Sequence, residues 1–250
     1  QKKPPLDLDE SAERCWRSAR RSSSAGAVAR MGRTSQGKVL AEEFTDDAFL
    51  GGRIRVRQPL RGYRVNVDTL LLAAAVAAEP GQRLMEAGCG VGAATLAVAA
   101  RAPQTHFVAV ERDSAMAELA RANVVANGFS HRIEIVKGDA LDRRAAWGVF
   151  DAVFFNPPFD LEGEGRPPAA ERRHAHLADR PLTDWVAALA DRLRGGGTLT
   201  LIQRAGRLAE ILSALEGRLG GAEVIPVRPR AADAAKRVLV RARKGSRAPL

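Results

Sequence analysis

Residues 154–159, FFNPPF, end an apolar run with a group of side chains that could hold an amine. Asn156 carries an amide oxygen, and the Pro157 carbonyl is a second acceptor whose direction is fixed because proline restricts the backbone. Two acceptors on the hydrogens of a planar amino group would orient it and let its nitrogen pyramidalise toward an electrophile. Phe159 offers a face on which an extruded base could stack. Asn156, Pro157, Pro158 and Phe159 are therefore the predicted catalytic residues for alkylation of a planar nitrogen.

A glycine-rich stretch, EAGCGVG, lies upstream in residues 86–92. Gly88, Gly90 and Gly92 let the backbone approach a ligand closely, and the start of the following helix favours acceptor groups or negative charge. With Ala93 the stretch also fits the G-x-G-x-x-G/A pattern, and Glu111 stands about 20 residues on, where a ribose-binding carboxylate is expected. These residues alone leave an NAD-binding Rossmann oxidoreductase open.

The acidic residues favour a different cofactor. Glu86 precedes the first glycine, where it would face a pyrophosphate unfavourably but would attract the ammonium group of S-adenosylmethionine. Gly138-Asp139-Ala140 ends a later strand and is placed to hydrogen-bond an adenine amino group. Strands ending in Glu86, Glu111 and Asp139 would set three carboxylates along one edge of a parallel sheet, the edge at which such sheets bind ligands.

Alternating strand and helix patterns supply the elements that would position these residues. Strands apolar on both faces indicate a parallel sheet covered by helices. Only a turn-like stretch separates the last two strands, so they are expected to pair antiparallel at an edge. The predicted fold is α/β: a Rossmann-like, seven-stranded, mostly parallel sheet with helices on both faces and a C-terminal antiparallel hairpin. The sheet strands are expected at residues 83–88, 106–111, 132–139, 150–156, 198–203, 222–227 and 237–243, and helices at 67–81, 92–102, 113–127, 182–194 and 206–219.

The N-terminal part of the chain differs from the rest. Residues 1–44 are rich in Ser, Arg and Ala without an apolar period, which predicts a disordered or loosely ordered tail, and Met31 is a candidate native start. After it, residues 53–59 and 63–66 alternate in the manner of strands and are expected to form a small hairpin through Gly62. Asp68 is the expected N-cap of the helix that follows.

Composition limits the partners. Cys15 and Cys89 are the only cysteines, which favours a reducing, cytoplasmic compartment. No apolar run approaches the ~20 residues of a membrane span, and no Cys/His cluster has zinc spacing, so neither a membrane nor a metal is expected. The formal net charge of +10 suits either a polyanionic partner or a solvated arginine-rich surface.

The motifs EAGCGVGAATL, AVERD, KGDA and FFNPPF resemble those of class I S-adenosylmethionine-dependent methyltransferases with an Asn-Pro-Pro-Phe/Tyr motif. The flanking stretches GYRVNVDTLLLAA, LTDWVAALADRLRGGGTLTLIQRAGRLAEIL and AAKRVLVRARKG are similar to the bacterial tRNA1(Val) adenine-N6-methyltransferase group, and the resemblance covers residues 49–245. It implies a methyltransferase domain over residues 45–250 and an acceptor amine, adenine N6 in tRNA, held by Asn156 to Phe159. Related enzymes act on ribosomal RNA guanine or adenine or on protein glutamine, and these acceptors stay open.

The resemblance also implies roles for individual residues. The cofactor site would comprise Asp68, Thr69, Glu86, Gly88, Cys89, Gly90, Gly92, Glu111, Arg112, Asp139, Ala140 and Asn156. Substrate contacts are expected from Phe159, Arg172, Arg173, Lys236 and Arg237. The chain departs from its relatives at Phe159, where many have Tyr, and at His174-Ala175-His176, where many have Ala-Arg.

Overall fold

The structure is a computed structural model that describes residues 44–62, 64–157, 160–161, 177–178 and 180–248. The predicted tail, apart from its last residue, lies outside the described residues. So do Pro158, Phe159, Arg172 and Arg173 of the predicted site. Among the described residues, no helix is long and apolar enough to cross a membrane.

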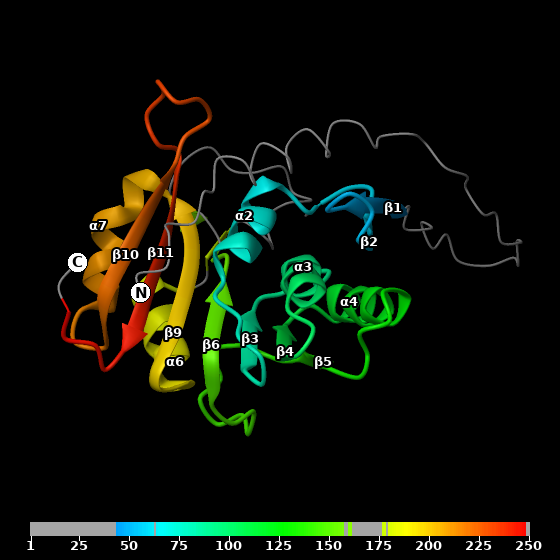
Figure 1. Cartoon of the computed structure of the whole chain (residues 1–250), viewed down its shortest axis with the longest axis horizontal. Coiled ribbons are helices and arrows are strands. Elements are labelled where there is room, and N and C mark those ends of the chain that lie inside the picture. Colours follow the sequence, from blue (N-terminus) through cyan, green and yellow to red (C-terminus); the bar gives the residue numbers. More distant parts are fainter. Residues whose placement is uncertain (1–43, 63, 158–159, 162–176, 179, 249–250) are drawn as a thin grey trace, which may run out of the picture.

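A seven-stranded sheet forms the centre of the molecule, with strand order β10-β11-β9-β6-β3-β4-β5 (Figure 1). The five strands from β9 to β5 are parallel to their neighbours, whereas β11 runs antiparallel to both β9 and β10. This arrangement confirms the predicted sheet and its C-terminal antiparallel hairpin. The strands are β3 (Arg83–Ala87), β4 (His106–Glu111), β5 (Ile133–Lys137), β6 (Phe150–Phe155), β9 (Leu193–Arg204), β10 (Leu219–Val227) and β11 (Arg237–Lys244).

Helices cover both faces of the sheet, which makes three layers (Figure 1). Successive residues of a strand face opposite sides, so Leu84 and Phe154 belong to one buried cluster, and Met85 and Phe155 to the other. The first cluster lies under α2 (Val67–Ala75), α3 (Ala93–Arg101) and α4 (Ser114–Ala126). The second lies under α6 (Leu182–Asp191) and α7 (Leu208–Leu215), the latter preceded by the short helix η2 (Ala205–Arg207). A two-stranded parallel pair, β7 (Asp160–Leu161) with β8 (Leu177–Ala178), stands apart from the large sheet.

Two local predictions before the sheet are wrong. The N-terminal hairpin pairs β1 (Phe44–Phe49) with β2 (Ile54–Pro59), not residues 53–59 with 63–66. The tight turn at Leu50, Gly51 and Gly52, all with positive φ, joins the two strands. Helix α2 is capped by Asn66, whose side chain accepts from the Thr69 N–H, and not by Asp68.

Asn123 of α4 and Asn127, the C-cap residue of this helix, dock the hairpin on the main body. Asn123 accepts from the Arg57 N–H (2.8 Å) and donates to the Arg57 carbonyl (2.9 Å), and Asn127 makes the same pair with Arg55 (2.9 and 2.7 Å). Residues i and i+4 of a helix are about 6 Å apart along its axis, close to the span of residues i and i+2 of a strand. The two asparagine side chains thus hydrogen-bond the backbone of β2 as a neighbouring strand would.

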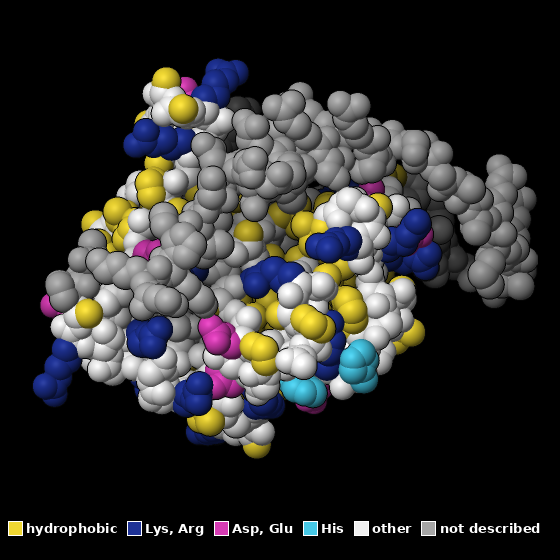
Figure 2. Space-filling view, in the orientation of Figure 1, with side chains coloured by type: hydrophobic (Ala, Val, Ile, Leu, Met, Phe, Trp, Pro, Cys, Tyr) yellow, Lys and Arg dark blue, Asp and Glu magenta, His cyan; other side chains and the backbone are white. Residues whose placement is uncertain are grey.

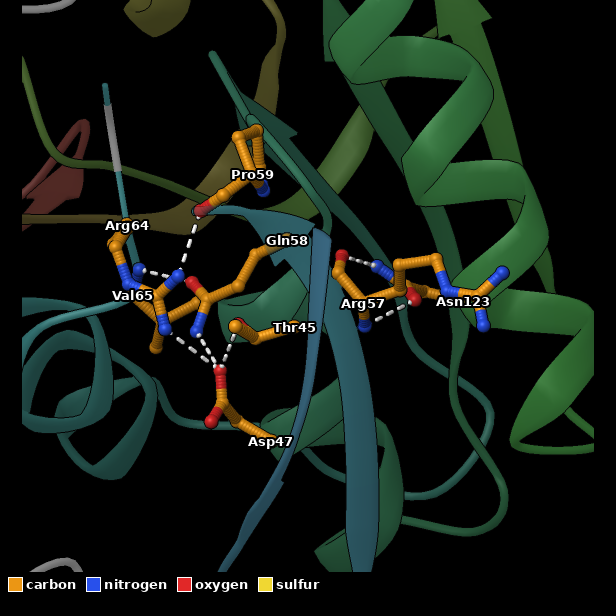
Figure 3. Close-up of polar contacts among 8 residues, drawn as sticks. All are labelled: Thr45, Asp47, Arg57, Gln58, Pro59, Arg64, Val65 and Asn123. Carbon is orange, nitrogen blue, oxygen red and sulfur yellow. Dashed lines mark hydrogen bonds and ion pairs between the residues drawn. The ribbon is translucent and has the colours of Figure 1, made fainter. Parts of the chain in front are cut away.

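A second polar network ties the hairpin to the segment before α2 (Figure 3). One Asp47 carboxylate oxygen accepts from Thr45, Gln58 and Arg64, at 2.7, 2.6 and 2.8 Å. Gln58, which is buried, also accepts from the Val65 N–H at 2.8 Å. The hairpin therefore holds the chain that leads into α2.

Candidate active site

Strand register brings the glycine stretch and Asn156 to one edge of the sheet. Ala87, the last residue of β3, pairs with Phe155 of β6 on one side and with Val110 of β4 on the other. Gly88 and Asn156 therefore leave adjacent strands at the same level. Because neighbouring strands are about 4.8 Å apart, the row of strand ends from β6 to β5 spans about 15 Å. We refer to this row, residues 88–92, 111, 138–140 and 156–157, as the rim.

The backbone of the glycine turn is hydrogen-bonded within the protein. The N–H groups of Gly88 and Cys89 both donate to the Val110 carbonyl, at 2.9 and 3.0 Å. The Gly90 N–H donates to Glu111 Oε2 at 2.8 Å. A pyrophosphate needs free backbone donors, and these three are already used, so the turn is poorly suited to the phosphates of NAD.

Glycine suits this turn because of its backbone conformation. Gly88, Gly90 and Gly92 have φ of 72°, 54° and 82°, in the left-handed region that side chains rarely adopt. A Cβ on Gly92 would contact the Ala120 Cβ of α4 at 3.4 Å, so the φ angle and not lack of space is what favours glycine there.

Glu111 fastens the rim from the end of β4. One carboxylate oxygen accepts from Gly90 and the other from the Asp113 N–H, at 2.8 and 2.9 Å. Each carboxylate oxygen has capacity for a second hydrogen bond, so Glu111 can still accept from hydroxyl groups of a ligand. This suits the predicted ribose contact.

Glu86 occupies a different environment from the one predicted for it. Its carboxylate is buried and accepts from both the backbone N–H (2.9 Å) and the hydroxyl of Thr95 at the start of α3. Burial raises the pKa of Glu86 to about 8, and the nearby Glu111 adds to the rise, although the Thr95 hydrogen bonds oppose it. A direct contact between Glu86 and a cofactor ammonium stays a prediction, and the carboxyl's contacts in this structure join β3 to α3.

Cys89 is buried, whereas Asp139 is exposed. Burial raises the pKa of the Cys89 thiol well above its usual value, so the sulfur is not a nucleophile at neutral pH. The Asp139 side chain is 45% exposed and pairs with Arg180 at 3.0 Å, while its other oxygen accepts from the Leu141 N–H at 2.9 Å. Ala140, the next residue, is buried.

Asn156 holds an unsatisfied acceptor. Its Oδ1 is buried and has no hydrogen-bond partner among the residues that the structure describes. Pro157 is buried beside it. A buried carbonyl oxygen without a donor is unfavourable by about 1–3 kcal/mol, so its presence at the ligand-binding edge indicates that a ligand supplies the donor.

The remaining predicted residues are partly engaged with one another. Asp68 of α2 is buried and forms an ion pair with Arg237 of β11. Thr69 is buried next to it, whereas Arg112 and Lys236 have exposed side chains. Lys and Arg side chains are spread over the visible face, including the projecting tip of the β10–β11 hairpin, and do not form a single patch there (Figure 2).

Three residues near the rim were not predicted from the sequence. Trp185 of α6 and Gln203 of β9 each carry a buried side-chain nitrogen without a partner among the described residues, and Arg180 pairs with Asp139. Trp185 stands in the apolar stripe of an amphipathic helix, and Gln203 ends an apolar strand, so the sequence pattern resembles ordinary packing. A polar residue at the end of a central strand was the one available signal, and it applied to Gln203.

The rim suits S-adenosylmethionine better than a dinucleotide. The ammonium and ribose hydroxyl groups of S-adenosylmethionine are donors, and Glu111 is an acceptor with remaining capacity. No group of three or more His, Cys, Asp or Glu residues suited to a metal ion occurs within the described part of the chain.

Comparisons with known proteins agree with this geometry. Residues 62–227 match the family described as the methyltransferase small domain. The chain is 32% identical over 202 residues to a tRNA1(Val) (adenine(37)-N6)-methyltransferase of Porphyromonas gingivalis, covering 77% of this chain and 79% of that protein. It is 29% identical to a release factor glutamine methyltransferase of Cereibacter sphaeroides, covering 78% and 67%. The crystal structure of a predicted O-methyltransferase from Agrobacterium tumefaciens superposes with a TM-score of 0.61 at 35% identity, covering 73% of this chain and 83% of that one.

Proposed function

The chain belongs to the methyltransferase small domain family and is an S-adenosylmethionine-dependent methyltransferase, and we propose that it methylates N6 of an adenine in tRNA. The observation that carries the proposal is the unpartnered Oδ1 of Asn156, because an exocyclic amine supplies the donor that this atom lacks. The P. gingivalis relative, named for this reaction, supports the choice of acceptor.

In the proposed mechanism the protein positions the amine and the cofactor supplies an activated methyl group. Asn156 Oδ1 and the Pro157 carbonyl accept hydrogen bonds from the two N–H groups of the amine, which orients the nitrogen and reduces its conjugation with the ring. Glu111 would hold the ribose hydroxyls, and Asp139 with Ala140 would contact the cofactor adenine, so Arg180 would have to share or release Asp139. Most of the rate enhancement comes from alignment, and the proton leaves to water after transfer.

Phosphate contacts are proposed for the tip of the β10–β11 hairpin. Arg228, Arg230 and Lys236 lie there with exposed side chains. Contacts between these cations and tRNA phosphates would release counterions from the tRNA, which favours binding. Arg237 contributes less than predicted because its Nε is bonded to Asp68. In this proposal residues 45–250 form the methyltransferase domain, residues 1–44 are a tail, and the enzyme acts in the cytoplasm.

The second candidate acceptor is a protein glutamine, favoured by the C. sphaeroides relative. An amide nitrogen is also planar and also bears two hydrogens, so the same two acceptors would hold it. Radiolabelled S-adenosylmethionine incubated with the enzyme and either unmodified tRNA, ribosomal RNA or release factor distinguishes the candidates. Label in tRNA that digests to N6-methyladenosine is expected, and label confined to release factor or to ribosomal RNA would overturn the proposal.

A further inference from the structure

Two unpartnered donors lie on the α6–α7 face of the sheet, at the level of the strand end that carries Asn156. Among the described residues, four buried side-chain N or O atoms have no hydrogen-bond partner: Asn156 Oδ1, Trp185 Nε1, Gln203 Nε2 and Arg241 Nε. Arg241 belongs to the middle of β11, and its guanidinium bonds Glu223 and the Ala75 carbonyl. Trp185 and Gln203 are close to the rim and have no part in the mechanism given above.

Gln203 is placed by the register of β6 and β9. Phe155 pairs with Leu201, so Gln203 stands two residues, about 7 Å, beyond Phe155 along the strand direction, at the level of Pro157. Residues 201 and 203 face the same side of the sheet, and Leu201 belongs to the cluster under α6 and α7. The Gln203 side chain is fully buried, and its oxygen accepts from the Arg204 N–H at 2.8 Å, which leaves the amide nitrogen without an acceptor.

Trp185 lies against the end of β6 on the same face. Its ring stacks on the Phe155 ring with centroids 5.7 Å apart and planes 3° from parallel. The far edge of the indole is 3.9 Å from the position that a Cβ would take on Gly88. Trp185 therefore borders the ends of β3 and β6, which carry the glycine turn and Asn156.

Unpartnered buried donors are unfavourable in the free protein. Each buried N–H without an acceptor destabilises the folded protein, and apolar residues of similar shape would avoid that loss. Two such donors and one unpartnered acceptor, on residues at the ends of β6 and β9 and on the helix packed against them, indicate a ligand with complementary groups.

We propose that Trp185 and Gln203 are specificity-determining residues that donate to a hydrogen-bond acceptor adjoining the methylated amine. The inference rests on the proposed function, in which Asn156 holds that amine. The ribose and adenine contacts proposed for the cofactor lie on β4 and β5, to one side of Asn156, whereas Gln203 is on β9, to the other side, and Trp185 stacks on Phe155 next to Asn156. The two donors are therefore assigned to the molecule that accepts the methyl group. Adenine has this pattern, because its N6 amine is flanked by the ring nitrogens N1 and N7, both acceptors.

The test removes the donors and the ring acceptors separately. Trp185→Phe keeps an aromatic ring for stacking but lacks the N–H, and Gln203→Met keeps the length of the side chain. Each variant is assayed on tRNA substrate carrying adenine, 1-deazaadenine or 7-deazaadenine at the methylated position. We expect each variant to lower kcat/KM about 10-fold on adenine, the effect of one hydrogen bond, with no further loss on the analogue that lacks the contacted nitrogen.

Two measurements separate this role from a structural one. S-adenosylhomocysteine, measured by calorimetry, should bind both variants as tightly as the wild type, because the donors lie on the acceptor side. The melting temperature should stay the same or rise, because an unpartnered donor has been removed. Phe155→Leu, which removes the stacking partner but no donor, is the matched control and should lower the melting temperature.

Lower melting temperatures in both donor variants, or equal losses on all three bases, would overturn the inference while leaving methyl transfer to adenine intact. Wild-type enzyme that methylates release factor and not tRNA would instead refute the proposed function. The melting temperatures and cofactor affinities of the two variants then still decide whether the donors serve a ligand.

Discussion

Asp68 and Arg237, which are 169 residues apart in the sequence, form an ion pair with 2.9 Å between Oδ2 and Nε. The Asp68 side chain is 5% exposed and that of Arg237 30%. The pair fastens the start of α2 to β11, beside the rim. One residue expected to contact the cofactor and one expected to contact the substrate thus hold each other in place.

Arg237→Met should destabilise the protein by about 2 kcal/mol, since it leaves the Asp68 carboxylate buried without its cation. The free energy of unfolding in urea measures this. The double variant Asp68→Asn/Arg237→Met should recover part of the loss. If the loss in the double variant equals the sum of the losses in Asp68→Asn and Arg237→Met, the pair contributes no coupling energy.

Asn156→Ala should lower kcat by about 100-fold or more, because the amine loses the acceptor that orients it. Binding of S-adenosylhomocysteine and the unfolding free energy should change little, since Oδ1 has no partner in the described part of the protein. Asn156→Asp keeps an acceptor at this position and should retain more activity than Asn156→Ala. Comparable turnover in Asn156→Ala and wild type would refute the assigned role.

Glu111→Gln should weaken S-adenosylhomocysteine binding by about 10–100-fold in calorimetry. Both carboxylate oxygens accept from backbone N–H groups, those of Gly90 and Asp113. In Glu111→Gln the amide NH₂ would replace one of these oxygens, so two hydrogen-bond donors would face each other. Asp113→Asn, at the N-cap of α4, also changes a carboxylate to an amide but keeps its oxygen acceptor, and serves as the control. Unchanged affinity in Glu111→Gln would remove this residue from the cofactor site.

Glu86 should make stability depend on pH. Its folded-state pKa of about 8 lies above the ordinary 4.5, so between these values the folded protein holds a proton that the unfolded chain has released. The contribution of Glu86 to stability is therefore full below the ordinary value and is lost as pH rises toward the folded-state value. Glu86→Gln lacks this titration.

The urea unfolding free energies of wild type and Glu86→Gln, measured at about pH 5 and about pH 8, test this sign. From about pH 5 to about pH 8, the unfolding free energy of Glu86→Gln should rise relative to that of the wild type by about 3 kcal/mol. A constant difference between the two proteins would show that Glu86 titrates alike in the folded and unfolded states.

Asn123→Ala should destabilise the protein by about 2–3 kcal/mol and Asn127→Ala by about 1 kcal/mol. Both side chains bond β2 and donate once more, Asn127 to the Asn123 carbonyl at 2.7 Å and Asn123 to the Val91 carbonyl at 3.0 Å, but only Asn123 is buried. Chemical denaturation gives the two losses, and amide exchange at Arg55 and Arg57 reports release of the hairpin. Equal losses in the two variants would contradict the importance of burial.

Local pattern predicted the sheet well because its strands are apolar and end at glycine, proline or polar residues. Pattern failed at the N-terminal hairpin. The partner of β2 has the sequence FTDDAF, and its two aspartates are residues that strands usually lack. In the folded protein Asp46 pairs with Arg57 and Asp47 with Arg64. The helix predicted over residues 182–194 ends at Asp191, and the glycines that follow at 195–197 form part of the long strand β9.

The candidate site divides in the same way. Asn156 and Glu111 follow from strand ends, which sequence locates. The pairing of Asp68 with Arg237 and the unpartnered nitrogens of Trp185 and Gln203 depend on which atoms meet in three dimensions. No spacing in a single sequence encodes a missing hydrogen bond.

The hydrogen bonds of the Gly88, Cys89 and Gly90 N–H groups in the glycine turn affect the free energy of cofactor binding. Val110 and Glu111 already fix the conformation of this turn, so an arriving cofactor encounters a surface in its final shape. The conformational entropy of the turn is surrendered when the chain folds and not when the ligand binds, which lowers the entropic penalty of complex formation. Affinity for the cofactor can then be tuned through a few side chains without remodelling the main chain.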